Sequence, residues 1–275
     1  MKHTDKKTFK LPAESTLVDT HCHLDMNEYH EDFDEVMATA AENGINKILT
    51  IGIDLDSSRN AVKLARRYDN IYAAIGIHPH NVANVNESDY VDLARMADDP
   101  KNKIVGYGEI GLDYFRDRCP REVQLTHFER QLNLAKELAL PIIIHDRDAH
   151  EDVLSLLHKA GPFPTGGVMH CFSGDISLAH KVMELGLHIS IPGIVTFKKS
   201  EIIQEVARTI PLDRMVLETD GPFLTPVPYR SKRNQPSFLR FTAAKVAELR
   251  EISVKDIAHH TTKNAHKLFG LGQFP

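Results

Sequence analysis

Residues 18–25 read VDTHCHLD and place two histidines one residue apart, inside a run that is otherwise typical of a β-strand. Because side chains alternate between the faces of a strand, His21 and His23 share a face with Asp19, while Cys22 points to the other face. Imidazoles facing the inside of a sheet pack poorly, but neutral imidazole is a good ligand for divalent transition metals. The His-x-His pair alone fits either a metal site or two hydrogen-bonded histidines in a loop.

The same chemistry recurs along the chain, each time at the end of an apolar run. The further residues of this kind are His78, Glu109, Asp113, His145, His170 and Asp220. In a parallel barrel the carboxyl ends of the strands meet at one mouth, where active sites gather. Imidazoles and carboxylates around one mouth predict a divalent metal site, with two ions bridged by a carboxylate. A purely structural zinc fits less well, because it is normally closed by four ligands.

Short strand-like runs alternate with longer amphipathic runs, which predicts the elements that position these residues. The expected strands span residues 16–24, 45–53, 71–79, 103–113, 141–146, 166–174, 188–195 and 215–220. The expected helices span residues 32–44, 56–68, 88–97, 121–139, 149–160, 175–186, 200–210, 237–250 and 253–270. Eight strand-then-helix units predict an α/β fold, a closed (β/α)₈ TIM barrel with the metal site at the C-terminal ends of its strands. The alternative, an open doubly wound sheet, usually carries a Gly-rich phosphate loop after its first strand, and HCHLDMNEYH is no such loop.

Composition and charge narrow the class of protein. The 275 residues are 42% hydrophobic and 26% charged, as in soluble globular proteins, and the net charge of −5 gives no overall basic field. No apolar run reaches the roughly 20 residues of a membrane helix, and the polar tail at residues 1–15 lacks the apolar core of a signal peptide. The three cysteines show no disulfide or metal-knuckle spacing. Strand alternation directs Cys22 and Cys171 outward toward the helices, where we expect them to be buried as small apolar residues. We therefore expect one barrel domain over residues 16–275, in the cytoplasm and without a membrane partner.

Eight short segments, in order, resemble the motifs of one known family. They read DTHCHLD, GIHPH, GEIGLDY, HDRDA, HCFSG, ETDGPFLTP, YRSKRNQP and NAHKLFG. From residue 17 to about residue 270 the chain is similar to the TatD-like metal-dependent deoxyribonucleases, which belong to the amidohydrolase-like hydrolases on a TIM barrel. The resemblance implies metal-dependent hydrolysis of DNA phosphodiesters, often from the 3′ end. We expect DNA as the partner, as single strands or 3′ ends, and a monomeric enzyme.

The resemblance also implies roles for individual residues. One metal is expected on His21, His23 and Asp220, and a second on His145 and His170, with Glu109 bridging the two. The pocket or outer positions are His78, Asp113 and Arg147. In the expected mechanism, Asp220 accepts the proton of a water that attacks phosphorus, so Asp220 and Glu109 are the expected catalytic residues.

Basic residues follow the last two strands, in the segment TFKK (196–199) and at Arg230 and Arg233. They are expected on the catalytic face, where they are predicted to bind DNA phosphates. The chain departs from the family pattern at Ser231 and Gln235, where the family usually has Gly and Glu. These two differences affect the expected substrate range and any additional metal, but not the two-metal core.

Several alternatives stay open from the sequence. The same barrel hosts hydrolases of cyclic amides, lactones and small phosphoesters, and a fold alone cannot decide between substrates. Many such relatives bridge their metals through a modified lysine, where this chain has Glu109. A non-catalytic binding protein would fit if a ligand were missing, and none is. The four histidines favour Zn²⁺, Mn²⁺, Co²⁺ or Ni²⁺ over Mg²⁺ as bound metals, although exchangeable occupancy would let Mg²⁺ or Mn²⁺ work in the cell.

Overall fold

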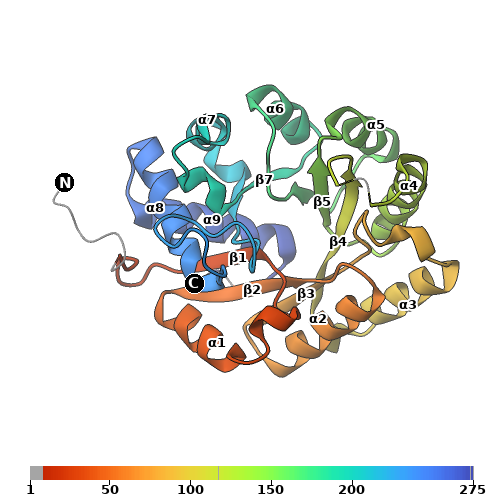
Figure 1. Ribbon diagram of the computed structural model, residues 1–275, viewed down its shortest axis with the longest axis horizontal. Coiled ribbons are helices and arrows are strands. Elements are labelled where there is room, and N and C mark those ends of the chain that lie inside the picture. The colour runs from red at the N-terminus through yellow and green to blue at the C-terminus, as the bar shows by residue number, and fades with distance from the viewer. Residues whose placement is uncertain (1–8, 117, 273, 275) are drawn as a thin grey trace.

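The computed structural model describes residues 9–116, 118–272 and 274. Eight parallel strands follow one another around a barrel in chain order (Figure 1). Their bounds are β1 Leu17–Cys22, β2 Ile45–Ile51, β3 Ile71–Ile75, β4 Ile104–Asp113, β5 Ile142–Arg147, β6 Gly167–Met169, β7 His188–Ile191 and β8 Met215–Leu217. This order confirms the predicted (β/α)₈ barrel and excludes the open doubly wound sheet, whose strand order reverses at a switch point.

The barrel closes where the segment after β8 meets β1. Cys22 and Gly221 form a parallel bridge there. The His23 N–H donates to the Gly221 carbonyl at 2.7 Å, and the Asp220 N–H donates to the His21 carbonyl at 2.8 Å. Predicted site residues are therefore held in place by the same backbone hydrogen bonds that close the barrel.

Helices follow the strands and surround the barrel (Figure 1). Their bounds are α1 Phe33–Glu42, α2 Leu55–Arg67, α3 Glu87–Ala97, α4 Arg121–Glu137, α5 His150–Ala160, α6 Ile176–Glu184, α7 Glu201–Thr209, α8 Leu239–Arg250 and α9 Val254–Phe269. Short polar side chains begin several of them: Asp54, Asp175 and Ser253 each accept a backbone N–H in the first turn of α2, α6 and α9. Such caps satisfy donors that the helix leaves unpaired.

Two groups of buried apolar side chains stabilise the barrel. The larger joins the strands to the surrounding helices, and Cys22 belongs to it together with Tyr29. The smaller joins Val18, Ile143 and Val216 of the strands to Phe269 at the end of α9. Within the described part of the chain, no helix is both long enough and apolar enough to cross a membrane.

The predicted tail at residues 1–15 lies partly outside the described residues, which begin at residue 9. The segment from residue 9 onward lies along the barrel. The Phe9 carbonyl accepts a hydrogen bond from Arg240 Nε at 2.8 Å, and Leu11 packs against the larger core. The domain boundary at residue 16 stays a prediction.

Asp19 ties β1 to the segment after β8. Its carboxylate accepts the backbone N–H of Thr219 at 2.9 Å and the Thr219 hydroxyl at 2.6 Å. The strand pairing shifts register between Asp19 and Cys22, so Asp19 does not join the histidines as simple alternation predicts. Burial raises the pKa of Asp19 to about 7, against the opposing effect of the Thr219 hydrogen bonds. Loss of a Thr219 donor should therefore destabilise the buried Asp19 carboxyl.

We predict that Thr219→Val lowers the free energy of unfolding by about 1–3 kcal/mol, because it removes a donor from a buried carboxyl. The measurement is urea unfolding of the metal-free protein. The matched control is Thr242→Val. The Thr242 hydroxyl is buried without a partner among the described residues, so this change should be neutral or stabilising. Equal losses for the two variants would contradict the role given to Thr219.

Candidate metal centre

A first group of ligand atoms converges at the ends of β1, β4 and β8. His21 Nε2 lies 3.3 Å from His23 Nε2, 3.4 Å from Glu109 Oε2 and 3.9 Å from Asp220 Oδ1. His23 Nε2 lies 3.8 Å from Glu109 Oε2 and 3.6 Å from Asp220 Oδ1. A tetrahedral shell with bonds of about 2.1 Å places its ligand atoms roughly 3.4 Å apart. These four side chains therefore have the spacing that a divalent metal requires.

A second group lies on the other side of Glu109. Glu109 Oε1 is 2.7 Å from His145 Nδ1 and 2.6 Å from His170 Nε2, and the two ring nitrogens are 3.3 Å apart. One oxygen of the Glu109 carboxylate thus faces each group. The first group is buried, and in the second Glu109 and His170 are buried while His145 is half-buried. Imidazole with carboxylate is a donor set suited to transition metals.

His78 faces Glu109 with a protonated ring nitrogen, unlike the residues of the two ligand groups. The backbone N–H of His80 donates to His78 Nδ1 at 3.1 Å, so the proton of the neutral ring lies on Nε2. That nitrogen is 3.6 Å from Glu109 Oε1. Burial holds the pKa of His78 well below its usual value, so the ring stays neutral. The ring therefore turns its N–H toward Glu109 from beyond hydrogen-bonding distance, which places His78 at the edge of the second group and not as a lone-pair ligand.

Register shifts in β1 and β4 direct His21 and Glu109 toward the candidate metal centre. The pairing of β1 with β2 shifts between Asp19 and Cys22, around His21, and the pairing of β4 with β5 shifts between Tyr107 and Ile110, around Glu109. Shifts of this kind re-aim side chains and are common beside active sites.

Gly111, in the predicted motif GEIGLDY, permits β4 and β5 to approach closely. It has φ +147°, and a Cβ atom there would lie 1.9 Å from the His145 carbonyl oxygen. A larger residue would therefore push β5 and His145 away from the centre.

Contacts from outside the two ligand groups fix the orientation of the His23 and His170 rings. His23 Nδ1 donates to the Ile51 carbonyl at 3.1 Å, which leaves the Nε2 lone pair facing the first group. Glu218 is fully buried, lies 3.5 Å from His170 Nδ1 and accepts the backbone N–H of Cys171 at 2.6 Å. These contacts indicate that Glu218 holds the His170 ring and the loop that follows it.

The buried carboxylate of Glu109 is stabilised by its neighbours. Burial alone would raise its pKa, but His170 and His78, with hydrogen bonds from His145 and His170, hold that pKa well below its usual value. Glu109 is therefore ionised and needs positive charge around it.

The histidines divide between neutral and charged forms. Burial, with the neighbouring His170, lowers the pKa of His21 to about 4. Burial would also lower the pKa of His23, but Asp220 and Glu109 outweigh it and raise that pKa to about 9. Metal ligands must be deprotonated, so a bound cation would replace ring protons in this cluster.

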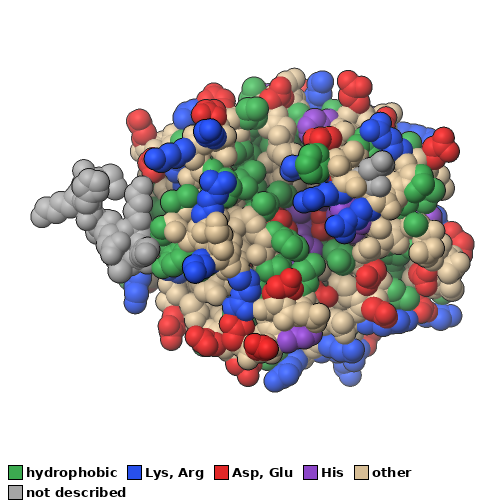
Figure 2. Space-filling view, viewed as in Figure 1, with side chains coloured by type: hydrophobic (Ala, Val, Ile, Leu, Met, Phe, Trp, Pro, Cys, Tyr) green, Lys and Arg blue, Asp and Glu red, His purple; other side chains and the backbone are tan. Residues whose placement is uncertain are grey.

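A cavity of about 660 Å³ opens above the centre. Figure 2 shows histidine side chains in a hollow of this face, with basic and apolar side chains around it. The predicted residues that line it are His23, His78, Glu109, Asp113, His145, Arg147, His170 and Asp220. His21 lies beneath, fully buried against the ring of His170.

Two other predicted substrate contacts do not line the cavity. Arg233 forms a two-pronged ion pair with Asp32, at 2.6 and 2.8 Å, and also donates to the Glu28 carbonyl. Arg230 lies 4.4 Å from the centre of the Phe197 ring. A phosphate contact at either arginine stays a prediction, and it needs a substrate that extends beyond the cavity.

The structure adds residues that the sequence alone did not point to. His80 lines the cavity and lies 2.8 Å from Asp113 Oδ2, and Arg116 and Arg118 line the same side. His80 had a signal, since it stands two residues after His78. Cys171 was expected to face the helices, but it lines the cavity because its backbone turns there, with φ +43°.

A barrel with this buried histidine and carboxylate centre belongs to the metal-dependent hydrolases. The profile of the family described as TatD related DNase matches residues 18–270. This chain therefore belongs to the TatD family of metal-dependent hydrolases.

Comparison with individual proteins supports the same family. The chain is 42% identical over 253 residues to the metal-dependent hydrolase YabD of Bacillus subtilis, covering 92% of this chain and 98% of the relative. It is 36% identical to a 3′-5′ ssDNA/RNA exonuclease TatD of Erwinia amylovora, covering 93% and 100%. The crystal structure of YJJV, a TatD homolog from Escherichia coli, superposes with a TM-score of 0.88 at 31% identity, covering 92% and 98%.

We predict that Zn²⁺ or Mn²⁺ raises the thermal midpoint of metal-stripped protein, because metal at a hundredfold excess over its Kd adds about 2.7 kcal/mol to folding. His170→Asn should weaken metal binding by more than about tenfold, measured by calorimetric titration. The control is His180→Asn, a change at an exposed position of α6. Unchanged binding in His170→Asn would show that the second group holds no metal.

Proposed function

We propose that this protein hydrolyses phosphodiester bonds in DNA, removing nucleotides from the 3′ ends of single strands. The observation that carries the proposal is Glu109, whose two oxygens face two separate groups of ligand atoms. Such a carboxylate suits a two-metal centre, which in other enzymes acts in the in-line displacement at phosphorus. The family and the relative named as an exonuclease support a nucleic-acid substrate.

In this proposal His21, His23 and Asp220 would hold one metal and His145 and His170 the other, with one Glu109 oxygen facing each group. The donor set fits Zn²⁺ or Mn²⁺ best, with Mg²⁺ as an exchangeable occupant. When bound, the metals supply Lewis-acid polarisation of the phosphate and lower the pKa of a water.

Side chains of this protein accept the proton and bind the substrate. Asp220 accepts the proton of the attacking water, for which its side chain is well placed at the floor of the cavity, 13% exposed. Its backbone has φ +56°, and its N–H is held by the His21 carbonyl, so the carboxylate is aimed by the fold. His78 Nε2–H, Asp113 and Arg147 bind or orient the substrate.

The three cysteines are free and two of them are buried. This supports a reducing compartment, and we place the enzyme in the cytoplasm as part of the proposal.

The test is cleavage of end-labelled single-stranded DNA by metal-stripped protein with Mg²⁺, Mn²⁺ or Zn²⁺ added back. We expect a ladder that shortens from the 3′ end. Asp220→Asn should lower kcat by about 10²–10⁴-fold, because it removes the base. Asp98→Asn, at an exposed position that follows α3, is the matched control and should keep wild-type rates.

Thermal unfolding of both variants shows whether the fold is kept. Near-full activity of Asp220→Asn would contradict its role as the base. No DNA cleavage by metal-loaded protein would instead favour a small-molecule ester, lactone or amide substrate, and a panel of such compounds would be assayed next.

A further inference from the structure

Three arginines form one wall of the cavity, and we call them the arginine wall: Arg116, Arg118 and Arg147. Arg116 and Arg118 follow β4, and Arg147 ends β5. All three side chains line the cavity and are exposed. None of them lies within ion-pair distance of a carboxylate in the described part of the chain.

In this respect the wall differs from the arginines of the described residues that do pair with a carboxylate. These are Arg59, Arg66, Arg95, Arg130, Arg208 and Arg233. Three guanidinium groups on one side of a cavity, none within ion-pair distance of a described carboxylate, give that side a local positive charge, although the whole chain is acidic.

The wall is built onto the metal centre rather than placed loosely beside it. Asp113 Oδ1 accepts the N–H of Phe115 at 3.0 Å and of Arg116 at 2.8 Å. Its other oxygen lies 3.3 Å from His145 Nε2, on the ring whose Nδ1 faces Glu109. The turn that carries the arginines is thus fixed to the same carboxylate that contacts the second ligand group.

An aromatic ring holds two of the guanidinium groups. Phe115 is 54% exposed, with Arg147 4.8 Å and Arg116 5.5 Å from the centre of its ring. A guanidinium stacked on a ring keeps the N–H donors along its edge free, and these donors match the oxygens of a phosphate.

The opposite side of the cavity has a different character. Met26, Ile53, Phe223 and Leu224 line it, and Phe223 is 47% exposed. The floor binds cations, one wall attracts anions, and the facing side offers apolar contact. At about 660 Å³ the cavity is far larger than one phosphate needs.

We propose that the arginine wall binds a second, non-scissile phosphate of the substrate, next to the phosphodiester that is hydrolysed over the ligand groups. The nucleoside between the two phosphates lies toward Phe223. The wall therefore selects a chain with two phosphates over an isolated phosphodiester. This inference rests on the proposed function and names the substrate feature that its site recognises.

The test compares thymidine substrates by kcat/KM in the presence of Mn²⁺: a dinucleotide with one phosphodiester, the same dinucleotide with an added 5′- or 3′-phosphate, and a trinucleotide. The second phosphate should raise kcat/KM by about tenfold or more, as a charged hydrogen-bonded contact does. The end-phosphate and trinucleotide arms show whether the wall accepts a terminal phosphate or an internal one. The gain should shrink as salt rises.

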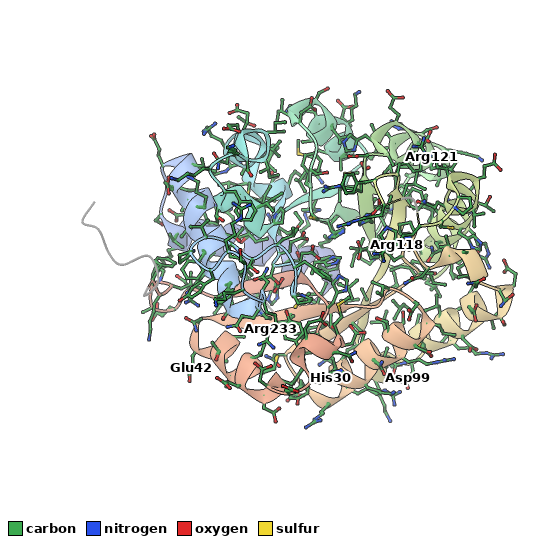
Figure 3. The ribbon with its side chains drawn as sticks, in the orientation of Figure 1. His30, Glu42, Asp99, Arg118, Arg121 and Arg233 are labelled. Carbon is green, nitrogen blue, oxygen red and sulfur yellow. The ribbon has the colours of Figure 1, made fainter. Side chains whose placement is uncertain are left out.

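Arg118→Gln is the test variant and Arg121→Gln its matched control. Figure 3 shows Arg118 toward the barrel mouth and Arg121 farther out, where it stacks on Tyr114 at 4.1 Å and does not line the cavity. We expect Arg118→Gln to lose at least fivefold more kcat/KM on the trinucleotide than on the dinucleotide, mainly through KM. Arg121→Gln should match the wild type.

The outcomes separate the two proposals. Cleavage by the wild type without any gain from a second phosphate would overturn the arginine wall alone. Equal losses for Arg118→Gln on every substrate would overturn it as well, since a structural defect acts on all of them. Failure of the wild type on every nucleotide would overturn the proposed function, and the wall with it.

Discussion

The structure depends on one buried negative charge, the carboxylate of Glu109. A carboxylate in a low-dielectric interior is costly unless positive charge surrounds it. Here the rings of His145 and His170 supply that charge, 2.7 and 2.6 Å from one of its oxygens, and the ring of His21 lies 3.4 Å from the other. Since no two of these residues are neighbours in the sequence, only a closed barrel brings them around one carboxylate.

The contacts that close the barrel are therefore also the contacts that build the candidate metal centre. The backbone hydrogen bonds that join Asp220 to His21 and His23 to Gly221 complete the barrel and position three candidate ligands at once. Asp19 adds a side-chain tie between the same segments through Thr219. A change that loosens this seam should affect metal affinity as well as folding stability, because the backbone of the candidate ligands is part of it.

The sequence predicted the barrel and the gathering of polar strand ends because both follow from periodicity and from the polarity of a parallel sheet. It could not predict the register shift in β1, which separates Asp19 from the histidines, since that depends on pairing with β2. It could not foresee that Arg233 pairs with Asp32, a contact across 201 residues. Nor could it predict that Cys171 lines the cavity, because the positive φ of Cys171 is a property of the loop after β6 and does not follow from strand alternation.

The distribution of charge bears directly on the substrate. A hydrolase of neutral amides or lactones gains nothing from unpaired guanidinium groups beside its reacting centre, because a neutral substrate offers them no charge to pair with. A polyanion would gain a charge contact at each arginine, and the exposed ring of Phe223 would add a stacking contact that does not depend on base identity. The site thus combines a carboxylate and histidine floor that attracts cations with a wall that attracts anions. A phosphate chain bound through metal ions is a ligand that satisfies both at once, which is the physical reason to favour a nuclease over the other hydrolases of this fold.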